Sequence, residues 1–242
     1  MKKVIVTDLD GTLAEIDGEI YTVEEENKEI ISLVNRNVII ASGRLPNFIK
    51  NVCDYLHIKH TFVASNGAIT YLNGKMIDCH YINPLSLKPL IKYVTKNCNN
   101  YCIHIDSLNK HREFYDDIDT DLIYNDDKIV RVNISLESND KEAVYTFLVN
   151  NNIEVEFVKC RRSIDITPKN ITKGKAIDNL IKTININEND LYILGNDTND
   201  LTMFTNHKNT FLIKSETNKH LFNSVKYIIN NFSELKYYIK ED

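Results

Sequence analysis

The chain has 242 residues, of which 43% are hydrophobic and 26% are charged. This composition is typical of a folded protein with one large or two modest domains, and it excludes a disordered or collagen-like chain. The net charge of −5 argues against a nucleic-acid binder, because such proteins carry a basic surface. No run of the sequence approaches the roughly 18 apolar residues of a membrane span, so we expect no membrane partner.

The cysteines and the N-terminal segment bear on the cellular compartment. Five cysteines are present, and none forms a pair at C-x-x-C spacing. This pattern predicts neither a disulfide framework nor a zinc knuckle. The apolar stretch from Val4 to Val6 is too short for the core of a signal peptide. We therefore expect a cytoplasmic protein with reduced thiols, as a monomer or a small homo-oligomer.

The first part of the chain alternates short β-branched runs with amphipathic helical patterns. Strands are predicted at Val4 to Val6, Val38 to Ile40 and Thr61 to Val63. Helices are predicted from Thr22, as N-cap, to about Asn35, and from Pro46 to Leu56. Alternating strands and helices predict a parallel sheet with helices on both faces.

The pattern changes after residues 71–75, where an Asn-Gly pair predicts a hairpin with a primed turn. The following segment has the pattern of a small α+β unit, and the strand–helix alternation resumes beyond Pro168. We therefore predict an α/β fold with a Rossmann-like parallel-sheet core, helices on both faces, and an inserted smaller α+β cap. The core is expected to comprise residues 1–83 and 160–242, and the cap residues 84–159.

Glycine is scarce, which makes each glycine informative. The chain has 7 glycines, whereas average usage near ~7% predicts about 17 in a chain of this length. Five of the seven follow a predicted strand or open a predicted helix, at Gly11, Gly43, Gly67, Gly174 and Gly195. In an open α/β sheet, ligands bind outside the carboxyl ends of the strands. We therefore expect a binding site at this edge of the sheet.

Two carboxylates stand at the end of the first predicted strand. Asp8 and Asp10 are separated by one residue, so their side chains are expected to point to the same side. Their mutual repulsion favours a cation between them. Because the donors are oxygens and no His or Cys is clustered nearby, the expected cation is the hard ion Mg²⁺. Taken alone, the pair fits a solvated turn with a helix cap equally well.

Five motifs in order, DLDGT, ASGR, SNGA, ITKGKA and GNDTNDLTM, resemble those of the haloacid dehalogenase (HAD) superfamily of phosphohydrolases. The resemblance is strongest to the Cof-like, type IIB branch with a C2 cap, and it runs from Asp8 to Met203. It implies a Mg²⁺-dependent phosphatase that acts on a small phosphorylated metabolite, with a sugar phosphate expected and compact substrates such as phosphoglycolate left open. A phosphomutase of the same fold is an alternative.

The resemblance also implies roles for individual residues. Asp8 is expected to be the nucleophile that forms an aspartyl-phosphate, and Asp10 the general acid and then base. Lys173 is expected to neutralise the phosphate and the Asp8 carboxylate. Contacts to phosphate or to the substrate body are expected from Ser42, Gly43, Arg44, Asn66 and Asn199. The metal site is expected to comprise Asp8, Asp10 and Asn196, with Asp200 behind the direct ligands and Asp197 as an alternative to Asn196.

One position departs from the family pattern. The fourth motif of the family usually reads G-D-x-x-N-D, and this chain has Asn196 in place of the first aspartate. An amide oxygen can bind Mg²⁺ but brings no negative charge, so we expect weaker metal affinity. Asn196 also motivates a second alternative, in which catalysis has weakened and the protein binds a phosphorylated ligand as a regulator.

Overall fold

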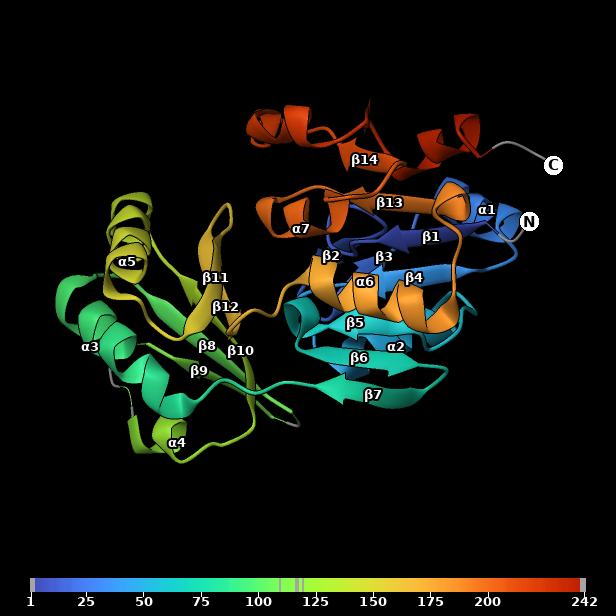
Figure 1. Ribbon diagram of the computed structural model, residues 1–242. Coiled ribbons are helices and arrows are strands. Elements are labelled where there is room, and N and C mark those ends of the chain that lie inside the picture. Colours follow the sequence, from blue (N-terminus) through green and yellow to red (C-terminus); the bar gives the residue numbers. More distant parts are fainter. Residues whose placement is uncertain (1–2, 109, 116–117, 119, 240–242) are drawn as a thin grey trace. The chain divides into compact units, whose positions relative to one another are not determined.

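The computed structural model describes residues 3–108, 110–115, 118 and 120–239. The chain divides into two compact units, which are coloured by sequence in Figure 1. The core unit comprises the described residues of Met1–Asp78 and Lys173–Asp242, and the cap unit those of Cys79–Thr172.

The core unit is built on an eight-stranded sheet with the strand order β15-β14-β13-β1-β4-β5-β6-β7. Its strands are β1 (Val4–Thr7), β4 (Val38–Ala41), β5 (Phe62–Ala64), β6 (Ile69–Leu72), β7 (Lys75–Cys79), β13 (Leu191–Gly195), β14 (Thr210–Ile213) and β15 (Tyr227–Ile229). Strand β1 pairs in parallel with β13 and β4, and the parallel ladder continues through β14, β15 and β5. Strand β6 is antiparallel to β5. The first strand therefore lies in the middle of the sheet, where its carboxyl end is surrounded by those of its neighbours.

Helices cover this sheet. They are α1 (Glu25–Leu33), α2 (Pro46–Tyr55), α6 (Lys173–Ile184) and α7 (Leu201–Phe204), with 3₁₀ turns η1 (Ser65–Gly67), η3 (Glu188–Asp190), η4 (Thr198–Asp200), η5 (Lys219–Ser224) and η6 (Phe232–Tyr237). Figure 1 shows α6 and α7 on one face of the sheet and α1 and α2 on the other. Ile177 and Leu180 of α6 pack with Val6 and Ile193 of the sheet. The predicted α/β class with helices on both faces is confirmed.

Two local predictions had different outcomes. The hairpin at Asn73 and Gly74 is confirmed as a primed turn, since both residues have positive φ, at 49° and 81°. The predicted N-cap at Thr22 is wrong. Thr22 pairs with Glu15 in a hairpin of β2 (Glu15–Asp17) and β3 (Ile20–Thr22), and α1 begins after Glu24 without a side-chain cap.

The cap unit is a five-stranded antiparallel sheet with the order β11-β12-β10-β8-β9, and two of its helices pack on one face of it. Its strands are β8 (Cys102–Ser107), β9 (Lys110–Phe114), β10 (Ile129–Ser135), β11 (Val155–Lys159) and β12 (Ser163–Pro168). Its helices are η2 (Pro84–Leu87), α3 (Lys88–Asn97), α4 (Thr120–Tyr124) and α5 (Ser138–Asn151). Ile103 and Ile164 of the sheet share a buried cluster with Leu90 of α3 and Leu148 of α5.

The structure divides the chain at other residues than those expected from the sequence. We expected the core to resume at residue 160, but β12 pairs with β10 and β11 and completes the cap sheet. Its sequence alternates Ser163, Ile164, Asp165 and Ile166, and both isoleucines are fully buried. This alternation is typical of an antiparallel strand with one apolar face. The cap unit therefore runs to Thr172.

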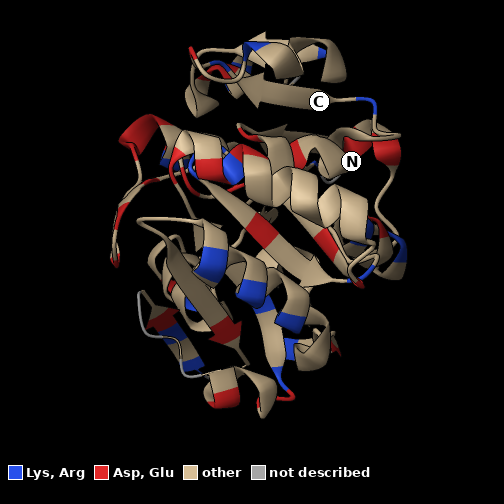
Figure 2. Cartoon of the chain, turned by 90° about the vertical axis from the view of Figure 1, so that its left-hand side faces the viewer, with Lys and Arg blue, Asp and Glu red and all other residues tan. Residues whose placement is uncertain are grey.

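Charged residues of both signs occur in both units. Figure 2 shows Lys and Arg interspersed with Asp and Glu over both units. Within the part of the chain that the structure describes, no helix is long and apolar enough to cross a membrane. All five cysteines are free thiols.

Candidate active site

Asp8 and Asp10 follow directly on β1, the central strand. The Asp8 amide donates to the Leu194 carbonyl at 3.0 Å, so the loop leaves the sheet only after Asp8. Leu9 is fully buried and anchors the turn, while Gly11 has φ of 71°. Alternation along this extended segment leaves Asp8 buried and Asp10 partly exposed on the same side of the loop.

Lys173, the first residue of α6, forms a buried ion triad with two carboxylates. Its Nζ lies 2.6 Å from Asp8 Oδ1 and 2.7 Å from Asp200 Oδ1. The exposed fraction of the side chain is 1% for Lys173 and 0% for Asp200. Burial alone would lower the pKa of Lys173, but the charges of Asp200 and Asp8 outweigh it and raise that pKa. Lys173 therefore stays protonated at any physiological pH.

The pKa of the Asp8 carboxyl is raised despite its contact with Lys173. Burial raises the pKa of Asp8 to about 7, and the charges of Asp200 and Asp10 add to this rise against the opposing effect of Lys173. A further cation beside Asp8 would favour the ionised carboxylate and lower its pKa. Because the donors here are carboxylate, carbonyl and amide oxygens, the residues fit a hard dication such as Mg²⁺.

Asp200 organises the loop that follows β13. Its Oδ1 accepts from Lys173, and its Oδ2 accepts from the main-chain amides of Asn196 and Asp197 at 2.8 and 3.1 Å. Asp197 and Asp200 form a capping box at the start of η4, where Asp197 accepts from the Thr198 amide at 2.6 Å. These contacts give Asp200 and Asp197 partners within the protein, and they tie the loop after β13 to Lys173.

Asn196 reaches across to the first loop. Its Nδ2 donates to the main-chain carbonyl of Asp10 at 3.1 Å, and its own carbonyl accepts from Asn218 Nδ2 at 2.8 Å. A Cβ added to Gly11 would lie 2.6 Å from Asn196 Nδ2. The family-variant position therefore lies beside both Asp10 and the glycine of the first motif.

Ser42, Gly43 and Arg44 follow β4, the neighbour of β1. Ser42 is 1% exposed, and its Oγ accepts from the Arg44 amide at 3.1 Å. The Arg44 guanidinium binds Asp10, with Nη2 at 2.7 Å and Nε at 3.1 Å from Oδ1, and Nη1 donates to the Gly18 carbonyl at 3.1 Å. We expected Arg44 to contact phosphate or substrate, whereas its side chain here positions the Asp10 carboxylate.

The segment after β5 has an unusual backbone. Ser65 and Asn66 have φ of 49° and 52°, in the left-handed region that non-glycine residues rarely adopt. Asn66 Oδ1 accepts from Asn199 Nδ2 at 3.3 Å, which joins the η1 turn to the η4 turn. The predicted residues Asn66 and Asn199 therefore meet.

Three residues of this region were missed from the sequence. The hydroxyls of Thr12 and Ser65 are buried and lack a hydrogen-bond partner among the described residues. Both hydroxyls lie on loops at the carboxyl ends of the central strands, and each leaves a donor available to a ligand. Their places in the DLDGT and SNGA motifs were a usable signal. The third, Asn218, holds the Asn196 loop from η5, and nothing near it in the sequence indicates this contact.

The chain matches the family model of haloacid dehalogenase-like hydrolases over residues 5–234. The chain belongs to this family. Among its relatives, YkrA of Bacillus subtilis, which is named as a phosphatase, is 24% identical over 83% of this chain and 82% of its own. A phosphatase-named protein of Mycoplasma pneumoniae is 23% identical over 81% of this chain and 80% of its own.

Solved HAD structures share the fold along nearly the whole chain. The HAD subclass IIB sugar phosphatase BT4131 superposes with a TM-score of 0.79 at 16% identity, covering 98% of both chains. A haloacid dehalogenase-like hydrolase from B. subtilis gives a TM-score of 0.77 at 15% identity, over 98% of this chain and 100% of that one. At these identities the likeness shows the fold. With its family and its phosphatase-named relatives, this HAD protein is a phosphatase that acts on a phosphorylated substrate.

Proposed function

We propose that this HAD phosphatase hydrolyses a sugar phosphate through an aspartyl-phosphate on Asp8, with Mg²⁺ as cofactor. The observation that carries the proposal is the buried triad of Asp8, Lys173 and Asp200 beside Asp10. Lys173 holds Asp8 Oδ1, which leaves Oδ2 as the attacking oxygen. A buried lysine between two carboxylates reduces the electrostatic repulsion when a dianionic phosphate approaches one of them.

The first half-reaction transfers the phosphoryl group to the protein. Asp8 Oδ2 attacks phosphorus, the bond to the sugar oxygen breaks, and the Asp10 carboxyl gives its proton to the departing alkoxide. Arg44 fixes the Asp10 carboxylate through two nitrogens, so the acid is held in place for this transfer. Thr12, Ser42 and Ser65 supply buried hydroxyls for the phosphate oxygens.

The second half-reaction releases phosphate. Asp10, now ionised, takes a proton from water, and the resulting hydroxide attacks phosphorus, so that the Asp8–phosphate bond breaks and the carboxylate is restored. Asp8, the Asp10 carbonyl and the Asn196 amide oxygen are the proposed Mg²⁺ ligands. Bound there, Mg²⁺ supplies positive charge that offsets the carboxylates and the phosphate.

The sugar phosphate class rests on the HAD subclass IIB sugar phosphatase, whose fold this chain shares. The test is a panel of hexose and pentose phosphates, phosphoglycolate and an aryl phosphate, assayed with Mg²⁺ and with excess EDTA. We expect turnover of at least one sugar phosphate, lost in EDTA and in Asp8→Asn. Asp190→Asn, which changes an aspartate of η3, is the matched control and should keep full activity.

Three results would contradict the proposal. Equal turnover with EDTA would exclude the metal requirement. Interconversion of sugar phosphate isomers that depends on a bisphosphate activator would indicate a phosphomutase. Saturable binding of phosphorylated ligands without turnover of any of them would indicate a regulatory binder.

A further inference from the structure

The cap sheet has one apolar and one polar face. Ile103, Ile105 and Phe114 point to the face covered by α3 and α5 and join its buried cluster. Because side chains alternate along strands, the residues between them lie on the other face. On β8 and β9 these residues are Cys102, His104, Asp106, His111 and Glu113. Five potential metal-binding or metal-supporting side chains thus share one face of two neighbouring strands.

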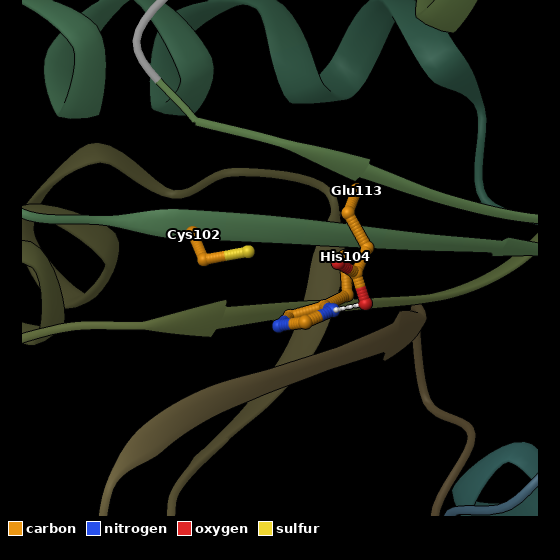
Figure 3. A group of neighbouring side chains, drawn as sticks. All are labelled: Cys102, His104 and Glu113. Atoms are coloured by element: carbon orange, nitrogen blue, oxygen red, sulfur yellow. Dashed lines mark ion pairs between the residues drawn. The ribbon is translucent and has the colours of Figure 1, made fainter. Parts of the chain in front are cut away.

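Three of these side chains converge. Cys102 Sγ, a ring nitrogen of His104 and a carboxylate oxygen of Glu113 all lie within 4.8 Å of one another. Figure 3 shows the three side chains on the two strands, with His104 paired to Glu113. The register places His104 directly opposite Glu113, and His104 Nδ1 lies 3.3 Å from Glu113 Oε1. Cys102, two residues before His104, faces the same way.

A second imidazole reaches the same carboxylate oxygen. His111 Nε2 lies 3.1 Å from Glu113 Oε1, and the two histidine rings are stacked with their centres 5.7 Å apart. His111 Nδ1 lies 2.6 Å from Asp106 Oδ1. Metal-binding histidines commonly have their other nitrogen held by a carboxylate in this way, which orients the ring and fixes its tautomer.

The orienting carboxylate is itself fixed. Asp106 is 3% exposed, and Arg131 Nε of β10 lies 2.9 Å from its Oδ2. The other oxygen of Glu113 accepts from the Tyr115 hydroxyl at 3.0 Å. Supporting contacts of this kind hold a donor set in place before a ligand arrives. Ion pairing accounts for the histidines and Glu113, and Tyr115 hydrogen-bonds the Cys102 thiol, but neither contact requires the sulfur to lie within 4.8 Å of the His104 and Glu113 donor atoms.

We propose that Cys102, His104 and Glu113, whose donor atoms converge, form a binding site for a divalent transition metal of the Zn²⁺ class, with His111, which contacts the same Glu113 oxygen, as the fourth donor. One sulfur, two imidazole nitrogens and one carboxylate oxygen match the ligands and the fourfold coordination that Zn²⁺ takes in proteins. Thiol and imidazole donors disfavour Mg²⁺, so this site is chemically distinct from the oxygen donors around Asp8. On binding, the Cys102 thiol gives its proton to solvent, the thiolate sulfur bonds the metal, and the imidazoles bind as neutral rings.

The site would join the edge strand β9 to β8. Cys102 and His104 come from β8, and His111 and Glu113 from β9, which has a neighbour on one side only. The spacing of the four ligands along the chain does not match a standard metal-binding motif, so it does not reveal the site. Only the antiparallel register brings them together.

Cobalt binding to the chelator-treated, full-length protein tests this site. Co²⁺ bound by a thiolate gives a charge-transfer absorption band, and Zn²⁺ should displace the cobalt and abolish the band. We expect the thiolate band to saturate at one Co²⁺ per chain, together with one Zn²⁺ per chain by elemental analysis after dialysis against excess Mg²⁺, which occupies the proposed oxygen site around Asp8. A protein without saturable Co²⁺ binding, or with binding but no thiolate band, would overturn the proposal.

Variants sharpen the test. Cys102→Ser should abolish the thiolate band, and His111→Gln should weaken Co²⁺ binding by at least tenfold. Cys79→Ser, another half-buried cysteine of the cap unit, is the matched control and should bind as the unchanged protein does. Asp8→Asn should also leave the thiolate band unchanged. An unaltered band in Cys102→Ser, or loss of the band in Asp8→Asn, would contradict the assignment. His111 is exposed, so its variant tests the site even if Cys102→Ser fails to fold.

Discussion

Lys173 Nζ lies between Asp8 Oδ1 and Asp200 Oδ1, at 2.6 and 2.7 Å. The lysine is 165 residues from Asp8 along the chain, so this contact joins the first strand to the helix that resumes the core unit. All three side chains are almost fully buried. The same cation therefore balances the charge of the proposed nucleophile and secures the loop that contains Asn196.

Lys173→Met is expected to destabilise the protein by about 3–5 kcal/mol, because it leaves two buried carboxylates without their cation. The double variant Lys173→Met with Asp200→Asn should recover part of this loss, since it removes one of the uncompensated charges. Urea unfolding of the single and double variants measures both effects. A double variant no more stable than Lys173→Met would show that Asp200 does not depend on the lysine charge.

Asn196→Asp should change stability in opposite directions without and with metal. In EDTA it replaces a donor to the Asp10 carbonyl by an acceptor, so we expect a loss of about 1–3 kcal/mol. The added negative charge should also raise the affinity for Mg²⁺ by about tenfold. Thermal unfolding across a Mg²⁺ titration measures both, and Asn209→Asp, which alters a similar contact to Leu191, is the control. An equal Mg²⁺ response in both variants would argue against Asn196 as a ligand.

Gly11→Ala should reduce activity at least tenfold, because its Cβ would lie 2.6 Å from Asn196 Nδ2 and displace that side chain. The positive φ adds a cost of about 1–2 kcal/mol. Gly74→Ala has a similar φ of 81° but no atom within 4 Å of the new Cβ. It therefore measures the backbone cost alone and should keep full activity. If Gly11→Ala and Gly74→Ala lost the same stability and both kept full turnover, the close approach of residue 11 to Asn196 would have no role in activity.

The metal-free protein should lose stability as pH rises from about 4 towards 7. Burial raises the folded-state pKa of Asp8 from 3.8 to about 7, so the folded protein binds a proton that the unfolded chain has released. The stabilisation is full below the unfolded pKa and is lost as pH rises through the folded one. Thermal unfolding in EDTA should show this decline, and Asp8→Asn should reduce it. A pH dependence unaffected by this variant would assign the effect to other groups.

The sequence predicted the loops of the site better than their contacts. Strand ends placed Asp8, Ser42 and Asn66 at one edge of the sheet, because parallel strands share an edge. Glycine scarcity indicated close approaches, and Cβ atoms at Gly174 and Gly195 would clash with Thr202 and Asp200. Gly11, Gly174 and Gly195 therefore stand at close approaches, whereas a Cβ at Gly18 or Gly74 would have nothing within 4 Å.

Contacts that depend on side-chain conformation or strand register were not predictable. Nothing in the ASGR motif distinguishes an Arg44 that binds Asp10 from one that binds phosphate. The place of β12 in the cap sheet depends on pairing with β10 and β11, which its own alternation does not identify. The meeting of His104 with Glu113 likewise follows from the register of β8 and β9.

Trapping of a phosphoenzyme is the decisive test of Asp8 as the nucleophile. The protein is mixed with a hydrolysed substrate and Mg²⁺, quenched in acid during turnover, digested, and its peptides are analysed by mass spectrometry. We expect one added phosphoryl group on the peptide that contains Asp8, and none in Asp8→Asn, which should also lack turnover. Turnover that leaves the Asp8 peptide unmodified and persists in Asp8→Asn would show that Asp8 is not the nucleophile.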